Sequence, residues 1–307
     1  MSKQAFRQQR FREDSLRRIV QMQEIVEEYK AQGLKLTARQ LYYQFVSRDL
    51  IPNTQRSYKN LTSLLTDARY AGLIDWGAIE DRGREPTQWS DFPNISACVD
   101  RAINSFRLPR WRDQNHYCEL WVEKQALAGV LEPLAAEFHV TLMVNKGYSS
   151  ASAMYEAAQR FMANANQAES DYFSDDSPEL EPVLFYLGDH DPSGEDMVRD
   201  IRDRLAEFGV MRLTVDKLAL TKEQVKKYRP PPNPAKQTDS RFEAYAAEHG
   251  RTSWEVDALP PNVLQDIIRD AFRQVVDERA MDAVKREETK AKQKLKAALA
   301  KIDGEGR

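Results

Sequence analysis

The chain of 307 residues has little cysteine and no long apolar run. Its two cysteines, Cys98 and Cys118, are too few for a disulfide framework or a cysteine zinc site, which is typical of the reducing cytoplasm. No apolar stretch approaches the ~20 residues that cross a bilayer. Residues 1–18 are basic and polar, without the apolar centre of a secretory signal. We therefore expect a cytoplasmic protein that makes no use of a membrane.

What the chain has in quantity is charge. Charged residues make up 30% of it and hydrophobic residues 41%, which is typical of a globular protein with one large or two ordinary domains. The net charge of −3 conceals an asymmetry, because basic residues prevail before about residue 90 and acidic residues between 169 and 207. This asymmetry favours polyanion binding at one end and metal binding at the other, although charge runs are more often solvated faces.

The basic N-terminal part is predicted to hold three helices. Apolar residues at helical spacing predict the first within residues 5–31, Thr37 caps a second, and a third ends at Gly72. Residues 73–79 are expected to add a small strand pair. Three helices and a wing outline a winged helix-turn-helix, whose last helix can enter a DNA groove, and a generic three-helix bundle has the same periodicity. The third-helix residues that we expect to contact DNA are Arg56, Lys59 and Arg69.

An alternating pattern of strands and helices begins after residue 115. Short apolar runs predict strands, and helices of ~10–15 residues lie between them, a pattern typical of a parallel sheet flanked by helices. The predicted strands are residues 120–122, 140–144, 183–186 and 212–215. The expected fold class is therefore α/β.

The most informative stretch follows the apolar run 183–186. Asp189 and Asp191 stand where that strand ends and a helix capped by Ser193 begins, and ligands bind at this edge of open α/β sheets. Alternate residues of an extended segment point the same way, so the two carboxylates converge. Hard oxygen ligands with room for water suit Mg²⁺, with Mn²⁺ as an alternative. A plain turn explains the same residues, since Asp, Pro, Ser and Gly are turn formers.

A third carboxylate is expected beside this pair. Glu123 follows the strand 120–122, and the carboxyl ends of parallel strands share one edge. Three carboxylates at that edge are expected to bind one or two divalent ions that polarise a phosphoryl oxygen. Two aspartates after a strand also suggest a haloacid dehalogenase-type phosphatase with Asp189 as nucleophile. That interpretation requires Thr or Val where this chain has Ser193, and it leaves Glu123 without a role.

Two groups of motifs resemble a known family. One group is Glu123 after an apolar strand, then Asn145-Lys146-Gly147, then Asp189-His190-Asp191-Pro192-Ser193-Gly194. It resembles the Toprim domain of topoisomerases, primases and some nucleases. The other is Thr37-Ala38-Arg39-Gln40-Leu41-Tyr42-Tyr43. It resembles the catalytic tyrosine segment of the topoisomerase VI A subunit and of its relative, the meiotic double-strand-break transesterase. The size is similar to that of short, stand-alone A-subunit-like proteins of phages and mobile elements.

The resemblance implies a CAP-like winged helix-turn-helix domain followed by a Toprim domain. Accordingly, the expected segments are a helical extension (1–33), the winged helix with the catalytic tyrosine (34–90), a linker (91–115), the Toprim domain (116–276) and a charged helical tail (277–307).

The resemblance also implies a chemistry like that of type IIB topoisomerases. A tyrosine attacks a phosphodiester of duplex DNA, leaving a 5′-phosphotyrosyl link and a free 3′-hydroxyl. Matching positions make Tyr43 the nucleophile and Arg39 its arginine, and helical spacing places both on one face. Tyr42 points about 100° away and is expected in the core, which is also the alternative for Tyr43. The matched Mg²⁺ ligands are Glu123, Asp189 and Asp191, and the lysines expected near DNA phosphate are Lys124 and Lys146.

Partners follow from the same resemblance. Cutting both strands implies a homodimer, in which the tyrosine of one protomer works with the metal site of the other. The chain has no Gly-rich ATP-binding domain, so ATP-driven strand passage would need a separate ATPase subunit. Two alternatives remain open: a Toprim nuclease that uses metal-activated water, and a non-catalytic DNA-binding protein. Glu255 and Asp257 lie in a stretch similar to the acidic segment late in these A subunits, with helix capping as the alternative.

Overall fold

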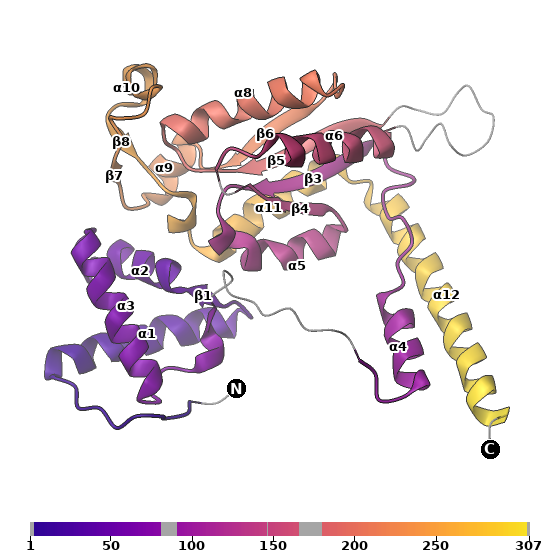
Figure 1. Ribbon diagram of the computed structural model, residues 1–307, viewed down its shortest axis with the longest axis horizontal. Coiled ribbons are helices and arrows are strands. Elements are labelled where there is room, and N and C mark those ends of the chain that lie inside the picture. The colour runs from indigo at the N-terminus through magenta and orange to yellow at the C-terminus, as the bar shows by residue number, and fades with distance from the viewer. Residues whose placement is uncertain (1–2, 81–90, 146, 166–179, 306–307) are drawn as a thin grey trace.

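The computed structural model describes residues 3–80, 91–145, 147–165 and 180–305. It has a mixed α/β fold in which a parallel sheet lies between helices, with a helical unit at the amino end and a two-helix arm at the other side (Figure 1). Lys146, one of the predicted DNA contacts, lies outside the described residues.

The N-terminal helical unit is formed by α1 (Glu13–Ala31), α2 (Ala38–Ser47) and α3 (Gln55–Tyr70). The apolar faces of all three helices share one core. The predicted cap of α2 is confirmed, because the Thr37 hydroxyl accepts a hydrogen bond from the Gln40 backbone N–H while the Gln40 side chain accepts one from Thr37. This reciprocal pair satisfies two backbone donors and sets the first residue of the helix.

The predicted strand pair within residues 73–79 is wrong. Instead, β2 (Ile79–Glu80) runs parallel to β1 (Leu36–Thr37), the segment that enters α2. The carboxylate of Asp75 accepts a hydrogen bond from the backbone N–H of Gly77 at 2.8 Å and starts a short 3₁₀ turn. Because this turn redirects the chain, residues on its two sides do not form a hairpin.

The predicted parallel sheet is confirmed. Its strands are β3 (His116–Val122), β4 (Thr141–Val144), β5 (Glu181–Leu187) and β6 (Thr214–Ala219). Their spatial order is β4-β3-β5-β6, and every pairing is parallel. Two strands differ most from the prediction in their bounds. β3 begins four residues before the predicted run 120–122, and β6 begins at Thr214 rather than Arg212 and extends to Ala219. The chain crosses from β3 to β4 on one side and returns to β5 on the other, so the switch point lies between β3 and β5.

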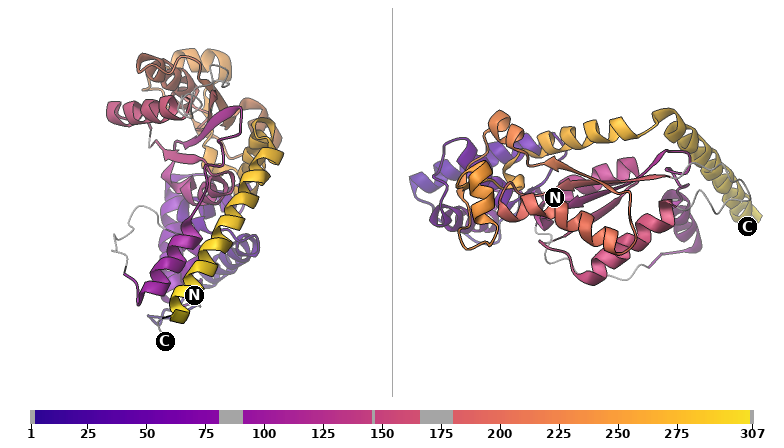
Figure 2. Two further views of the ribbon diagram at one scale, coloured as in Figure 1. Left: turned by 90° about the vertical axis from the view of Figure 1, so that its right-hand side faces the viewer. Right: turned by 90° about the horizontal axis from the view of Figure 1, so that it is seen from above.

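Helices cover both faces of the sheet. They are α5 (Ala128–Phe138) and α11 (Pro261–Val275) on one face, and α6 (Ala151–Ala165) and α8 (Pro192–Glu207) on the other. Figures 1 and 2 show these two helical layers. Along β3, Leu120 belongs to the first apolar core and Trp121 to the second, as the alternation of side chains in a strand requires.

A run of short elements connects β6 to α11. They are α9 (Lys222–Tyr228), β7 (Asn233–Pro234), α10 (Phe242–His249), β8 (Thr252–Ser253) and the 3₁₀ turn η3 (Val256–Ala258). Backbone hydrogen bonds in both directions between His190 and Trp254 join this run to the loop after β5. They bring η3 to the carboxyl edge of the sheet.

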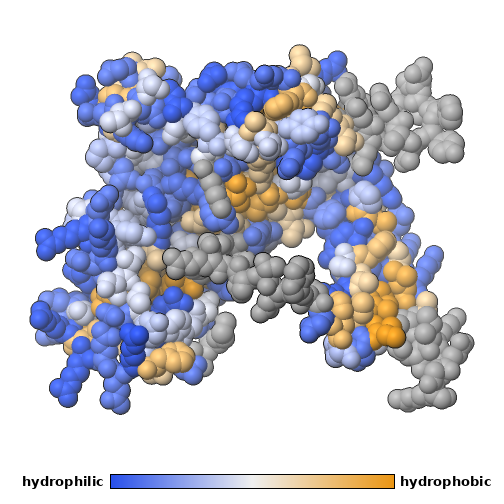
Figure 3. Space-filling view, viewed as in Figure 1, coloured by the Kyte–Doolittle hydropathy of each residue, from blue (hydrophilic) through white to orange (hydrophobic). Residues whose placement is uncertain are grey.

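The arm consists of α4 (Ile95–Ser105) and α12 (Glu278–Glu305), which lie side by side (Figure 2). The buried carboxylate of Glu288 holds them together, since it accepts a hydrogen bond from the Leu108 backbone and pairs with Arg110. Apolar side chains remain on the outside of α4, where Ile95 is 82% exposed (Figure 3). Across the described ranges, no helix combines the length and apolar character needed to span a membrane.

Candidate active site at the carboxyl edge of the sheet

The carboxylates singled out from the sequence lie at the switch point. Glu123 follows β3, Asp189 follows β5, and these two strands are neighbours at the centre of the sheet. The Glu123 backbone N–H donates to the Leu187 carbonyl at 2.9 Å, and the Glu123 carboxylate accepts a hydrogen bond from the Asp189 backbone N–H at 3.1 Å. The sheet therefore brings together two residues that are far apart in the sequence.

Their electrostatics favour a cation. Burial, followed by the negative charges of Asp189 and Asp191, raises the pKa of Glu123 to about 6. Burial also raises the pKa of Asp189, against the ammonium of Lys124, which lowers it. The Lys124 ammonium offsets this mutual repulsion only in part, and a divalent ion would neutralise more of it.

Asp191 has a second task in the fold. Its Oδ1 atom accepts hydrogen bonds from the backbone N–H of Gly194 at 2.6 Å and from the Ser193 hydroxyl at 2.9 Å. The predicted capping role of Ser193 is therefore wrong, because Asp191 is the N-cap of α8. The helix starts two residues earlier than a Ser193 cap predicts, at Pro192, whose fixed φ suits the first position of a helix.

The site suits Mg²⁺ by the type of its oxygen ligands, although these ligands do not form a complete coordination shell. Among the residues that the structure describes, no three His, Cys, Asp or Glu side chains converge closely enough to hold a metal ion. Mg²⁺ usually keeps several waters and takes only one or two protein carboxylates directly. Glu123, Asp189 and Asp191 supply hard oxygen atoms at one edge of the sheet, so the residues present fit this ion.

The loop after β5 is held by residues that sequence reasoning missed. The Lys217 ammonium, on β6, donates to the Asp189 carbonyl and to the Glu195 carboxylate, both at 2.8 Å. Burial would raise the pKa of Glu195, but hydrogen bonds from His190 and Lys217 lower it to about 2. A side chain at Gly194 would collide with the Asp189 carbonyl, since a Cβ there would lie 2.1 Å from its oxygen.

Lys124 joins the carboxylate edge to η3. Its Nζ atom lies 2.9 Å from Asp189 Oδ1, 2.7 Å from Glu255 Oε2 and 3.0 Å from Asp257 Oδ1. The sequence suggests a DNA phosphate contact for Lys124. In this structure its ammonium is enclosed by three carboxylates of its own chain, so a phosphate has to compete with them.

The predicted pair on α2 lies against the same cluster. Arg39 Nη2 is 3.4 Å from the Tyr43 hydroxyl, as their helical spacing predicts. On its other side the guanidinium pairs with Asp257, at 3.1 Å from Nε to Oδ2, and with Glu255. Burial raises the pKa of Tyr43, the charge of Asp257 raises it further, and the cations Arg39 and Lys124 oppose both.

The two neighbouring tyrosines have different surroundings. The Tyr42 hydroxyl donates to the Asn53 side chain at 2.7 Å and to the Thr54 carbonyl at 3.3 Å, and its ring lies in the helical core, as expected. The Tyr43 hydroxyl instead contacts Arg39 at the boundary with the sheet unit. Tyr43 is therefore the better placed of the two for chemistry at the carboxylate edge.

The predicted DNA-contact cations of α3 fall into two groups. Arg56 and Lys59 are exposed to solvent. Arg69 is half-buried, its guanidinium donates to the Trp76 carbonyl at 3.0 Å, and it lies 4.5 Å from the centre of the Trp76 ring. Burial lowers the pKa of Arg69. This residue holds the turn after α3, and its proposed DNA contact would require it to leave Trp76.

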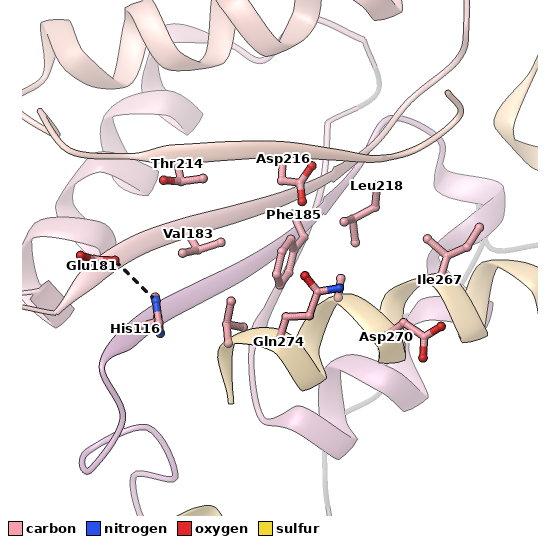
Figure 4. A pocket seen from close by; sticks show the side chains of 12 residues that line it. His116, Glu181, Val183, Phe185, Thr214, Asp216, Leu218, Ile267, Asp270 and Gln274 are labelled. Atoms are coloured by element: carbon pink, nitrogen blue, oxygen red, sulfur yellow. Dashed lines mark ion pairs between the residues drawn. The ribbon is translucent and has the colours of Figure 1, made fainter. Parts of the chain in front are cut away.

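A pocket of about 450 Å³ lies elsewhere (Figure 4). It begins at His116 and Glu181, the first residues of β3 and β5, and runs along β6 beside α11. Because the strands are parallel, their first residues lie at the edge opposite Glu123 and Asp189. None of the predicted site residues lines this pocket.

The structure thus brings Arg39, Tyr43, Lys124, Glu123 and Asp189 to one boundary, and it adds Glu255 and Asp257 to them. The sequence points to this pair as well, through the resemblance of the stretch Trp254-Glu255-Val256-Asp257-Ala258-Leu259 to the acidic segment late in the A subunits. Compared with known proteins, the chain matches no protein-family model and no curated protein.

Proposed function

We propose that this protein is a topoisomerase VI A-subunit-like transesterase that binds duplex DNA and cleaves it with Mg²⁺, using Tyr43 as nucleophile. One observation carries the proposal. Arg39 contacts the Tyr43 hydroxyl and also Asp257, and Asp257 shares Lys124 with Asp189. A continuous chain of contacts therefore links the predicted nucleophile to the predicted metal ligands, which come from separate parts of the sequence.

In the proposed reaction the Tyr43 oxygen forms a bond to a DNA phosphorus while the bond from phosphorus to the 3′ oxygen breaks. The phenol loses its proton, and the departing 3′ oxygen takes one up as a hydroxyl. The positive charge of Arg39 beside the phenol favours loss of the proton, and its guanidinium is suited to a phosphate oxygen. A bound Mg²⁺ would neutralise charge on the phosphoryl group and on the 3′ oxygen.

The proposal includes the domain pairing and the partners. The three N-terminal helices are proposed as a CAP-like winged helix-turn-helix in which the β1–β2 pair takes the place of the predicted strand pair, with Arg56 and Lys59 facing DNA. The sheet unit is proposed as a Toprim domain. The placement of Glu123 and Asp189 at the switch point supports the second assignment. In this proposal, cleavage of both strands requires a homodimer. ATP-driven strand passage requires a separate ATPase subunit.

One feature favours the nuclease alternative, in which Tyr43 is structural and water is the nucleophile. Tyr43 is 4% exposed, so a phosphodiester does not reach its hydroxyl in this form of the protein. The transesterase proposal therefore requires α2 to move relative to the sheet edge, or its neighbours to rearrange, when DNA binds. The nuclease requires no such change.

The deciding experiment uses end-labelled linear duplex DNA with Mg²⁺ or Mn²⁺. The reaction is stopped with detergent and divided, and one half is treated with protease. We expect label that stays with the protein until proteolysis in wild type and in Tyr42→Phe. We expect no attached label in Tyr43→Phe or Asp189→Ala.

Tyr42→Phe is the matched control, since it removes a buried hydroxyl one residue away that bonds only within the helical unit. Free cleaved ends that persist in Tyr43→Phe would establish the nuclease instead. DNA binding without cleavage by wild type under every condition would favour the non-catalytic binding protein.

A further inference from the structure

We infer that Asp257, together with Glu255, is a positioning residue that fixes Arg39 and Lys124 and couples the tyrosine helix α2 to the carboxylate edge of its own chain. Neither residue is proposed to touch the reacting phosphate. The inference deepens the proposed function, and its catalytic consequence rests on that function. Its structural consequence can be measured separately.

Asp257 lies between two cations. Its Oδ2 atom is 3.1 Å from Arg39 Nε, and its Oδ1 atom is 3.0 Å from Lys124 Nζ. The side chain is almost fully buried, with 1% of the residue exposed. A buried carboxylate keeps its charge only when cations or hydrogen bonds compensate it, and here the two cations come from different units of the fold.

Glu255, the residue directly before η3, contacts the same two cations. Its Oε2 atom accepts from Lys124 at 2.7 Å and also from the Arg39 guanidinium. Two cations and two carboxylates therefore alternate around a small ring. Without the carboxylates between them, the positive charges of Arg39 and Lys124 would repel each other. The acidic pair is what allows both cations to stand beside Tyr43 and Asp189 at once.

The segment that carries the pair is itself anchored on both sides. The backbone N–H of Val256 donates to Asp189 Oδ1 at 2.9 Å, and Val256 lies in the core beneath the sheet. Ala258, two residues later, lies in the core of the N-terminal helices. η3 thus belongs to both cores, so movements of α2 and of the sheet edge are transmitted through it.

This arrangement lies within one chain. The family resemblance implies that a tyrosine works with the metal site of the partner protomer, whereas here Arg39 of α2 pairs with η3 of the same chain. Because these ion pairs fix both cations relative to η3, they limit the reorganisation that remains when Tyr43 becomes accessible to DNA. In this inference, contacts within a single chain hold the phosphate-binding cations in place.

The test compares Asp257→Asn and Asp257→Ala with Glu288→Gln in the full-length protein. Glu288 is a matched control, because its buried carboxylate also pairs with several cations, but on the α4–α12 arm. Hydrogen exchange of the α2 amides, measured in EDTA, is expected to accelerate about tenfold or more in both Asp257 variants, as loss of a charged hydrogen bond predicts. Exchange in α2 is expected to stay unchanged in Glu288→Gln.

A second measurement follows covalent adduct formation in a single turnover with saturating DNA and Mg²⁺. Asp257→Asn is expected to slow this rate by about tenfold while the Kd for DNA changes less than about threefold. A variant that acts only by unfolding would lose DNA binding and the rate of adduct formation together. Urea denaturation of each variant shows whether its stability has changed.

Each outcome decides something. If α2 exchange stays at the wild-type rate in both Asp257 variants, the coupling role is wrong, whatever the activity. If wild type forms an adduct and both Asp257 variants form it at the same rate, the positioning role fails while the proposed function stands. Accelerated α2 exchange with no adduct in wild type would overturn the proposed function and leave the coupling intact.

Discussion

Two glutamates, Glu119 within β3 and Glu123 directly after it, differ in how their charges are compensated in the middle of the sheet and at its edge. Glu119 lies within β3 and is fully buried, and its carboxylate accepts hydrogen bonds from Tyr117, Trp121 and twice from Arg160, all at 2.8 to 3.0 Å. Glu123 follows the end of β3 and accepts one described hydrogen bond, from the Asp189 backbone.

The difference separates a structural carboxylate from a candidate ligand. The charge of Glu119 is compensated by hydrogen bonds and an ion pair within its own chain, so this carboxylate has a structural role. Glu123 faces other carboxylates, which raise its pKa to about 6 after burial. The chain compensates Glu123 less completely than Glu119, and this difference is the basis for proposing Glu123 as a cation ligand.

The largest expected effect is on the structural glutamate. Glu119→Ala leaves the Arg160 guanidinium without its carboxylate and should lower the free energy of unfolding by about 3 kcal/mol, measured by urea denaturation. Glu181→Ala is the control, since that carboxylate lies at the exposed start of the neighbouring strand. Equal losses for the two variants would contradict the structural role of Glu119.

The next effect concerns pH. A carboxyl group whose pKa is raised in the folded protein binds protons more tightly there than in the unfolded chain. The free energy of unfolding of wild type should therefore fall as the pH rises from about 4.5 to about 6. Glu123→Gln should remove this pH dependence, and its free energy of unfolding at pH 7 in EDTA should be about 1–2 kcal/mol higher than that of wild type. A Glu123→Gln protein that is less stable than wild type at pH 7 would show that the carboxylate is compensated after all.

A smaller effect is expected from Mg²⁺. A cation that binds only the folded protein adds about 1.4 kcal/mol at a concentration tenfold above its Kd. The increase in Tm with Mg²⁺ should appear in wild type, in Glu181→Ala and in Lys292→Met, and be lost in Glu123→Gln and Asp189→Ala. Loss of the response in Lys292→Met, which lies on the arm, would point to a cation site elsewhere.

The smallest effect extends the comparison to the cations of α3. Arg56→Ala and Lys59→Ala should change the free energy of unfolding by less than about 0.5 kcal/mol and lower the slope of log K for DNA against log salt by about 1 each. Arg69→Ala should lower stability instead, because Arg69 is bound to Trp76. Fluorescence anisotropy with labelled duplex DNA over a salt series measures these slopes.

Features with a local cause could be predicted from the sequence. The Thr37 cap and its partner Gln40 are three residues apart, and the strand and helix periodicities arise within single elements. The parallel sheet followed from the alternation of those elements. The prediction failed where a single side chain redirected the backbone, as Asp75 did in the missing strand pair and Asp191 did at the start of α8.

The candidate site was predictable only in part. The positions of Glu123 and Asp189 follow from a rule about strand ends, so the sequence was sufficient to place them at one edge. The surroundings of Lys124 were not predictable, because two of its three carboxylates, Glu255 and Asp257, lie more than a hundred residues later in the chain. Nothing local to Lys124 distinguishes a phosphate contact from an ion pair inside the protein.

Local patterns of polarity and turn chemistry were enough to specify the α/β class, the strand ends and the acidic residues that gather there, since these depend on neighbours a few residues apart. Only the tertiary structure decided which partners each charged side chain has, because the partners of a buried charge come from distant segments and act only at contact distance. Glu119 and Glu123 look alike in the sequence, four residues apart, and packing alone made one structural and left the other open to a cation.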